Sequence, residues 1–180
     1  MRKLFQGLAA AVLGITTATA ATAAQDVTIV VDDGYKPYTF KDENGNITGI
    51  YTQVLREVDK NLEDYNIQFK AYPWKRGVKM LKSGDAFALA PPYHFPEERP
   101  FIHPYSEKIL EEKVVAYCRA DVMDQERPNW PADYKGLTVG NNDGFETPGE
   151  AFFELVDKGE IQLMEAKNTL VNLRNLIAGR

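Results

Sequence analysis

The segment between residues 91 and 105 concentrates side chains that could bind a small molecule. Arg99 is its only lysine or arginine, among five prolines and six rings: Pro91, Pro92, Pro96, Pro100 and Pro104, with Tyr93, His94, Phe95, Phe101, His103 and Tyr105. A guanidinium can donate two parallel hydrogen bonds to a desolvated carboxylate. The alternative is a surface arginine that pairs with Glu97 or Glu98 and adds little stability. Because long loops of this composition are more often functional than idle, we expect a binding site here.

Polar residues also follow two predicted strands. Asp32 and Asp33 end the apolar run 27–31. Ligands gather at the carboxyl ends of strands in open α/β sheets, so one of these acids could meet an ammonium group, while a turn-capping role is the alternative. The loop Asn141–Thr147 leads into a predicted helix, whose free N–H groups and dipole favour an anion. Thr147 could equally be the N-cap of that helix.

The residue types give weak support to catalysis. His94 and His103 lie beside no nucleophile motif, and two histidines with nearby carboxylates fall short of a metal-binding set. The sequence contains neither of the phosphate-binding patterns GxxxxGK[ST] and GxGxxG. Cys118, the single cysteine, falls in an apolar run, which predicts an inert core residue. We therefore expect no catalytic residue, no cofactor and no metal.

The elements that must position these residues follow from the periodicity of apolar side chains. Residues 26–90 read as strand, helix, strand, helix, strand, which is typical of a parallel sheet covered by helices. The strands are expected at 27–31, 67–69 and 87–90, and the apolar run 113–118 predicts another. The first helix carries the stripe Ile50, Val54, Leu55, Val58 and Leu62, and the second carries Trp74, Val78 and Leu81. Trp74 is therefore as easily a core residue as a binding residue.

A second, smaller α/β unit is expected after the polar connection 119–135. Its predicted strands are residues 137–139 and 161–163, and its predicted helices are residues 149–158 and 170–177. Two strands and two helices provide little with which to bury a core.

The N-terminus has the three-part layout of a secretory signal peptide. Arg2 and Lys3 precede the apolar run Leu8–Ile15, which is too short to span a bilayer, and small residues follow with A-x-A sites ending at Ala20 and Ala23. We expect cleavage near Gln25 and export to the periplasm. With Cys118 as the only cysteine, the cleavage site offers no residue for lipid attachment.

The charge of the expected mature chain limits its partners. Residues 25–180 hold 19 Lys and Arg against 26 Asp and Glu, a net charge of −7. Such a balance argues against nucleic acid and against anionic membrane surfaces as partners. It does not constrain a ligand, because a pocket can oppose the overall sign.

Five motifs, in order along the chain, resemble the type 3 extracellular solute-binding family, the receptors for polar amino acids and related solutes. They are Tyr35-x-Pro37-Tyr38-x-Phe40, Gly45-x-x-x-Gly49-Ile50, Pro73-Trp74-Lys75-Arg76, Pro96-Glu97-Glu98-Arg99 and Pro104-Tyr105-Ser106. The resemblance covers roughly residues 26–180. It implies an α/β fold with two lobes, the periplasmic-binding-protein-like (type II) fold, in which the lobes close on a ligand in the cleft.

The resemblance also implies an organisation of the chain. Family members continue beyond the segment that matches residues 170–180, so the second lobe and the return crossover are expected to be incomplete here. The expected parts are a signal peptide at residues 1–24, lobe 1 at 25–118, a crossover or linker at 119–135 and a partial lobe 2 at 136–180.

Roles of single residues follow from the same resemblance. Members that bind amino acids hold the ligand carboxylate with an arginine in the loop after the third strand, which corresponds to Arg99, although residues 91–98 form a longer, more proline-rich loop than is typical. The family places an aromatic ring against the ligand where Tyr35 and Tyr38 stand, and a core position is the alternative for Tyr38. Arg76 faces either the cleft or solvent. The expected ligand-binding residues are Arg99, Tyr35, Asp32, Trp74, Tyr93, Arg76 and Thr147.

The function implied is binding without chemistry. We expect a monomeric periplasmic receptor that delivers a small polar solute, an amino acid or similar zwitterion, to an inner-membrane ABC permease. Two alternatives remain open. One is a periplasmic enzyme of the dehydratase or lyase kind on the same fold, and the other is a sensor that delivers its signal to a receptor kinase.

Overall fold

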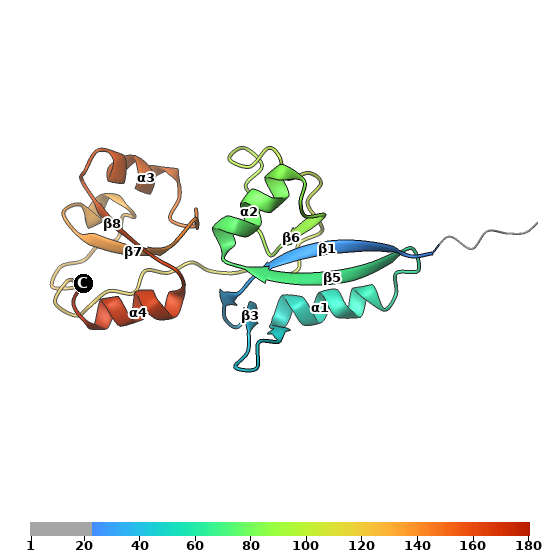
Figure 1. Ribbon diagram of the computed structural model, residues 1–180. Coiled ribbons are helices and arrows are strands. Elements are labelled where there is room, and N and C mark those ends of the chain that lie inside the picture. Colours follow the sequence, from blue (N-terminus) through green and yellow to red (C-terminus); the bar gives the residue numbers. More distant parts are fainter. Residues whose placement is uncertain (1–22) are drawn as a thin grey trace, which may run out of the picture.

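The computed structural model describes residues 23–180, arranged as two lobes joined by a long connection (Figure 1). Lobe 1 is the part from β1 to the loop 91–105, and lobe 2 is the part from residue 132 to α4. Residues 106–131, the crossover segment, join them. The predicted signal peptide, residues 1–24, lies outside the described residues apart from Ala23 and Ala24. No helix among residues 23–180 is long and apolar enough to span a membrane.

Lobe 1 is built on a parallel sheet of three strands in the order β5-β1-β6. The strands are β1 (Gln25–Asp32), β5 (Tyr65–Tyr72) and β6 (Ala88–Ala90). The helices α1 (Ile50–Asp59) and α2 (Trp74–Ser83) lie on opposite faces of this sheet (Figure 1). The predicted alternation of strands and helices in residues 26–90 is therefore confirmed.

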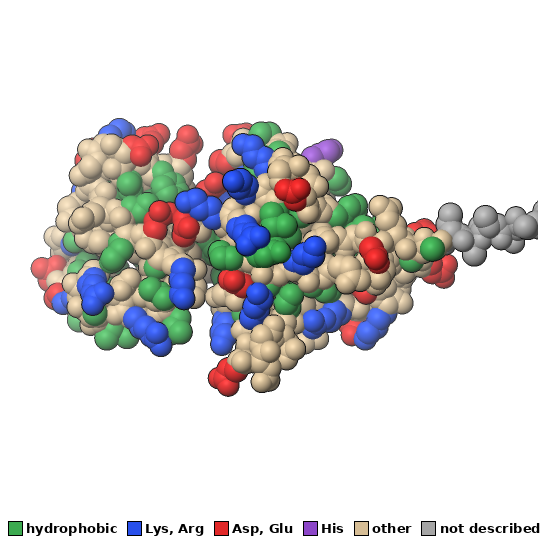
Figure 2. All heavy atoms as spheres, in the orientation of Figure 1, with side chains coloured by type: hydrophobic (Ala, Val, Ile, Leu, Met, Phe, Trp, Pro, Cys, Tyr) green, Lys and Arg blue, Asp and Glu red, His purple; other side chains and the backbone are tan. Residues whose placement is uncertain are grey.

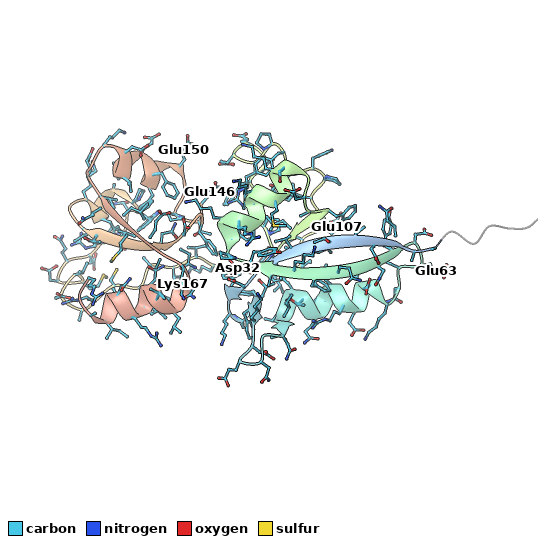
Figure 3. All side chains as sticks on the ribbon, viewed as in Figure 1. Asp32, Glu63, Glu107, Glu146, Glu150 and Lys167 are labelled. Atoms are coloured by element: carbon cyan, nitrogen blue, oxygen red, sulfur yellow. The ribbon has the colours of Figure 1, made fainter. Side chains whose placement is uncertain are left out.

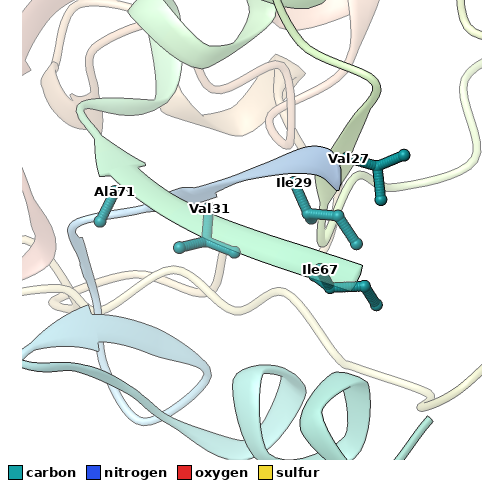
Figure 4. Close-up of a cluster of buried hydrophobic side chains, with 5 residues drawn as sticks. All are labelled: Val27, Ile29, Val31, Ile67 and Ala71. Atoms are coloured by element: carbon teal, nitrogen blue, oxygen red, sulfur yellow. The ribbon is translucent and has the colours of Figure 1, made fainter. Parts of the chain in front are cut away.

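The central strand β1 is apolar from Val27 to Val31, apart from Thr28, because both of its faces are covered there. Val27, Ile29 and Val31 point to the α1 side, where they pack with Ile67 and Ala71 (Figure 4). Val30 points the opposite way and packs with residues of α2 and β6, as successive side chains in a strand must alternate. The α2 helix lies very close to this face. A Cβ added at Gly77 would stand 2.9 Å from Leu89 and 3.0 Å from Val30.

The buried face of α1 differs from the predicted stripe. The helix buries Tyr51 and Thr52 and packs Leu55 against the core, whereas most of the predicted stripe is 36% to 44% exposed: Ile50, Val54, Val58 and Leu62. The helix is rotated so that the side centred on Tyr51 and Leu55 meets the sheet. The sheet beneath it is only three strands wide, which leaves the flank of the helix in solvent.

A small antiparallel sheet that the periodicity did not predict follows β1. It consists of β2 (Gly34–Tyr35), β3 (Thr39–Lys41) and β4 (Ile47–Thr48), in that order. The turn between β3 and β4 is held by the Asp42 carboxylate, which accepts the N–H groups of Asn44 and Asn46 at 2.9 and 2.7 Å. Strands of two or three residues are too short to show an alternating pattern. This sheet fixes the position of Tyr35.

Lobe 2 contains a parallel pair of strands with a helix on each side (Figure 1). The elements are the short helix η1 (Ala132–Tyr134), β7 (Thr138–Asn142), α3 (Glu150–Asp157), β8 (Gln162–Ala166) and α4 (Thr169–Ile177). Asn168 caps α4, its side chain accepting the N–H of Val171 at 3.1 Å. The strands and helices predicted for this unit are confirmed, with boundaries shifted by a few residues.

The strand predicted at residues 113–118 is wrong. This part of the crossover segment has no regular structure, and Val114, Val115 and Tyr117 are more than half exposed. A strand needs a neighbour for its backbone hydrogen bonds, and none of the described strands pairs with this segment. For the same reason Cys118 is half-buried and not a core residue of a strand.

Candidate functional site

A small cavity lies where the two lobes meet, at the loop ends of β1, β6 and β7. Lobe 1 and lobe 2 both line it, with Tyr35, Trp74, Pro91, Tyr93, Phe95, Arg99, Phe145, Glu146 and Thr147. Figure 3 shows Glu146 on the side of lobe 2 that faces lobe 1, and Asp32 at the junction. The cavity measures about 20 Å³, room for about one water molecule. At this point of the junction the side chains of the two lobes leave no room for a larger molecule.

Arg99 is the most buried charged group of this cavity, with 3% of the residue exposed. The loop 91–105 fixes its backbone, since the Arg99 N–H donates to the Phe95 carbonyl at 2.9 Å and the Arg99 carbonyl accepts from buried Ile102 at 3.0 Å. The guanidinium Nη2 lies 2.7 Å from Oε2 of Glu146. Its Nε is buried and has no hydrogen-bond partner among residues 23–180. The guanidinium therefore uses Nη2 in an ion pair, while its Nε–H donor stays unused.

Aromatic rings surround the Arg99 guanidinium. Its carbon lies 5.6 Å from the ring centre of Trp74 and 5.6 Å from that of Phe95. Such contacts offset part of the cost of burying the cation. They leave the N–H groups at the edge of the guanidinium as the atoms that can bind an anion.

The loop Asn141–Thr147 of lobe 2 fills the space in front of Arg99. Phe145 stands edge-on to Tyr35 and Trp74, with ring centres 5.6 and 5.9 Å apart. The Asn141 side-chain amide donates to the Phe145 carbonyl at 2.7 Å and holds the loop in shape. Lys75, at the start of α2, pairs with Asp143 at 3.0 Å. Basic and acidic side chains meet across the junction of the lobes (Figure 2).

The opposite wall of the cavity is held by one carboxylate. Glu112 of the crossover segment accepts hydrogen bonds from the hydroxyls of Tyr35, Tyr93 and Tyr51 at 2.7, 2.6 and 3.1 Å. Burial first, and then hydrogen bonding with Glu112, raises the pKa of Tyr93 to about 12. The pKa of Tyr35 and that of Tyr51 are raised too, with burial as the largest cause. All three hydroxyls therefore stay protonated and donate to Glu112 at neutral pH.

Five of the seven predicted site residues come together in this cavity: Arg99, Tyr35, Trp74, Tyr93 and Thr147. Trp74 lines the cavity and also packs with Val30 and Leu89 in the core. The alternative role of Thr147 as N-cap is wrong. The α3 helix begins at Glu150 with Gly149 at its N-cap position and has no side-chain cap.

Two predicted site residues lie elsewhere. Arg76 is exposed on α2, where its guanidinium stacks on the ring of Tyr72 at 4.0 Å. Asp32 is buried but does not line the cavity, and its carboxylate accepts the N–H of Gly34 at 2.7 Å. Burial is the main cause that raises the pKa of Asp32 to about 6.

Sequence reasoning did not single out Phe145, Glu146, Phe95 or Glu112. The first two belong to the loop Asn141–Thr147, where attention fell on Thr147 as the residue next to a helix. Phe95 was counted among the rings of the loop 91–105 without a role of its own. Glu112 stands in a charged stretch with no local signal, so only its three tyrosine partners reveal it.

A second, open cavity of about 1000 Å³ adjoins the first. It runs from Tyr35 and Tyr93 along residues 112–119 of the crossover segment to β7 and α4.

Two α/β lobes with a cavity between them define the class of two-lobe periplasmic binding proteins. Residues 27–172 match the family model described as bacterial extracellular solute-binding proteins, family 3, and the chain belongs to this family. A comparison with curated proteins finds no match.

Solved structures of binding proteins share this fold. An ancestral amino acid-binding protein, a precursor of cyclohexadienyl dehydratase, matches with a TM-score of 0.68 and 17% identity over 86% of this chain and 66% of that chain. A putative L-cystine ABC transporter protein from Listeria monocytogenes matches with a TM-score of 0.65 and 20% identity over 87% and 66%. An ancestral arginine-binding protein bound to arginine matches with a TM-score of 0.64 and 18% identity over 86% and 66%.

These matches confirm the predicted two-lobe α/β fold. The chain spans about 66% of the length of these structures, so about a third of each has no counterpart in this chain.

Proposed function

We propose that this protein is a periplasmic solute-binding receptor that captures an amino acid or similar zwitterion and presents it to an inner-membrane ABC permease. The single observation that carries the proposal is Arg99, a buried cation at the junction of two lobes with an unpaired Nε. Membership of the solute-binding family supports the general role, and relatives of this fold include proteins described as binding amino acids, arginine and cystine.

The Arg99 guanidinium is suited to a ligand carboxylate. Its partner Glu146 is 44% exposed at the side chain and sits on a loop of the other lobe, so it can withdraw when the lobes separate. A ligand carboxylate could then use both Nη2 and the unpaired Nε in the two-pronged arrangement that guanidinium favours. Glu146 thus occupies the place that the ligand's own anion would take.

The aromatic walls supply the apolar contact area for the rest of the ligand. Tyr35, Trp74 and Tyr93 line the cavity on the lobe 1 side, and Thr147 faces them from lobe 2. Aromatic faces offer a large contact area and can hold a cationic group. A ligand with an anionic end, an apolar middle and a polar or cationic end fits this set.

Binding at Arg99 requires the side chains in front of it to move. The cavity of about 20 Å³ beside Arg99 has no room for an amino acid, so Phe145 and Glu146 must move before a ligand in the larger open cavity can reach Arg99. The ligand can favour a closed, liganded form only by its greater affinity for that form. The crossover segment, which has no regular structure over residues 113–118, is where such a movement can be absorbed.

The test is calorimetric titration of the purified protein with L-arginine, L-glutamine and L-cystine. We expect saturable binding of at least one of them, with loss of binding in Arg99→Ala and little change in Arg76→Ala. Binding that survives in Arg99→Ala would contradict the proposal. N-terminal sequencing of periplasmic material, expected to begin near Gln25, tests the export step.

A second candidate function is an enzyme on the same fold, since one similar structure is described as a precursor of cyclohexadienyl dehydratase. Asp32 favours it, because burial raises the pKa of this carboxyl to about 6 and suits it to proton transfer. Asp32 does not line the cavity with Arg99, however, so binding alone is better supported. Conversion of the bound solute, followed by NMR, would favour the enzyme.

A further inference from the structure

We infer that Glu112 is a positioning residue for the ligand site, which acts by holding the aromatic wall formed by Tyr35 and Tyr93. The inference rests on the proposed function and adds to it a residue outside the cavity. Glu112 lies in the crossover segment and lines the larger open cavity, but not the small cavity that contains Arg99. Its influence on a ligand there would have to pass through the tyrosines.

The contacts of Glu112 join three separate parts of lobe 1. Its Oε2 accepts from Tyr35 of β2 at 2.7 Å and from Tyr93 of the loop after β6 at 2.6 Å. Its Oε1 accepts from Tyr51, in the first turn of α1, at 3.1 Å. The hydroxyls of Tyr35 and Tyr93 are themselves 3.3 Å apart. One carboxylate therefore anchors three rings at their far ends.

Anchoring a tyrosine at its hydroxyl fixes the direction of its ring. Tyr35 and Tyr93 both line the cavity, so the faces that a ligand would meet depend on where their hydroxyls are held. Tyr51 does not line the cavity and shares only the contact with Glu112. It thus provides a way to disturb Glu112 without touching the ligand.

The charge of Glu112 has no cationic partner that would explain it as an ordinary ion pair. Among residues 23–180, each ion pair joins other groups, and the polar partners of Glu112 are the three hydroxyls. Hydrogen bonds to an ionised acceptor are stronger than those between neutral groups. A charged residue is thus better suited than a neutral amide to hold the wall rigid.

The decisive variant is Glu112→Gln, with Glu111→Gln as the matched control. Glu111 is the neighbouring residue, its side chain is 82% exposed, and its partner is Lys108 on the surface. Glu112→Gln should bind the best of L-arginine, L-glutamine and L-cystine about fivefold to tenfold more weakly than wild type. Glu111→Gln should bind as wild type does.

A second readout needs no ligand. Removing the carboxylate that accepts their hydrogen bonds should lower the pKa of Tyr35, Tyr51 and Tyr93, so tyrosinate absorbance should rise at lower pH in Glu112→Gln than in Glu111→Gln.

Tyr51→Phe, like Glu112→Gln, should weaken ligand binding. In the double variant, adding Tyr51→Phe to Glu112→Gln should weaken binding by less than Tyr51→Phe does alone, because both changes act on one hydrogen-bond network.

The outcomes separate the two proposals. Binding that depends on Arg99 but is unchanged in Glu112→Gln overturns this inference alone. Full additivity of Tyr51→Phe and Glu112→Gln also overturns it. If wild-type protein binds none of the three solutes, the proposed function fails and this inference fails with it, whereas the tyrosine titration still reports whether Glu112 makes the contacts described.

Discussion

Two arginines of lobe 1, separated by 23 positions in sequence, stand in opposite surroundings. Arg99, in the loop 91–105, is 3% exposed, has aromatic rings on its faces and keeps an unpaired Nε. Arg76, on α2, is exposed and stacks on Tyr72. The side chains are chemically identical, so the difference in their expected roles comes from burial. A guanidinium in solvent already has water as a partner, whereas a buried one with an unused donor gains strongly from an anion.

Of the variants that test this comparison, Arg99→Ala should change ligand affinity the most. Arg99→Ala would leave a ligand carboxylate buried without its cation, at a cost of about 2–5 kcal/mol, or roughly 30-fold to several-thousand-fold in affinity. Arg99→Lys should recover only part of the loss, because an ammonium group cannot reproduce the two-pronged contact. Calorimetric titration of both variants measures this. Full affinity in Arg99→Ala would remove the functional distinction between the two arginines.

Glu146→Gln should have a smaller effect in the opposite direction. The Glu146 carboxylate occupies Arg99 at 2.7 Å and competes with a ligand carboxylate for the same donors. Replacing it with a neutral amide should tighten binding by about threefold to tenfold, because the closed form without ligand loses its ion pair. The matched control is Glu150→Gln, which removes a nearby exposed acid of α3. Weaker binding in Glu146→Gln would mean that Glu146 assists the ligand and does not compete with it.

The same comparison of a buried with a less buried charge can be made for two acids, Asp32 and Asp33. Here the measured quantity is the stability of the fold. The pKa of Asp32 in the folded protein is about 6, above the ordinary value of 3.8, so its contribution to stability is full below pH 3.8 and is lost as the pH rises to about 6. Asp32→Asn keeps an oxygen for the Gly34 N–H and should raise Tm at pH 7 by about 2–4 °C. The gain should vanish near pH 4. Asp33→Asn, at the half-buried neighbour whose charge also raises the pKa of Asp32, should give a smaller gain of the same sign in thermal unfolding at pH 7.

Arg76→Ala should have the smallest effect of the series. The side chain lies on the exposed surface of α2 and lines neither cavity, so affinity should change by less than about twofold. The same titration series measures it. A large loss in Arg76→Ala together with unchanged binding in Arg99→Ala would place the carboxylate site on α2 and reverse the comparison.

Local patterns in the sequence determined the elements of this protein. The apolar run of β1, the existence of α1 and α2, and the alternation of strand and helix through residues 26–90 are properties of neighbours in the chain, and the fold confirms them. The face that α1 buries differs from the predicted stripe. Arg99 and the rings of the loop 91–105 could be proposed as candidate binding residues from their types alone, and the structure places Arg99, Tyr93 and Phe95 in one cavity. The exceptions are instructive. Residues 113–118 have the composition of a strand, but composition provides no partner strand.

Contacts between distant residues were decided only by the tertiary structure. Glu146 reaches Arg99 across 47 positions, and Glu112 reaches Tyr35 across 77 and Tyr51 across 61, distances over which no periodicity carries information. Thr147 was chosen for its place next to a helix, while the neighbouring Phe145 and Glu146 proved to fill the site. The sequence determined which charged and aromatic side chains are available to the cavity. Only the closure of one lobe on the other decided which of them are buried together, because burial depends on what covers a residue and not on its neighbours in the chain.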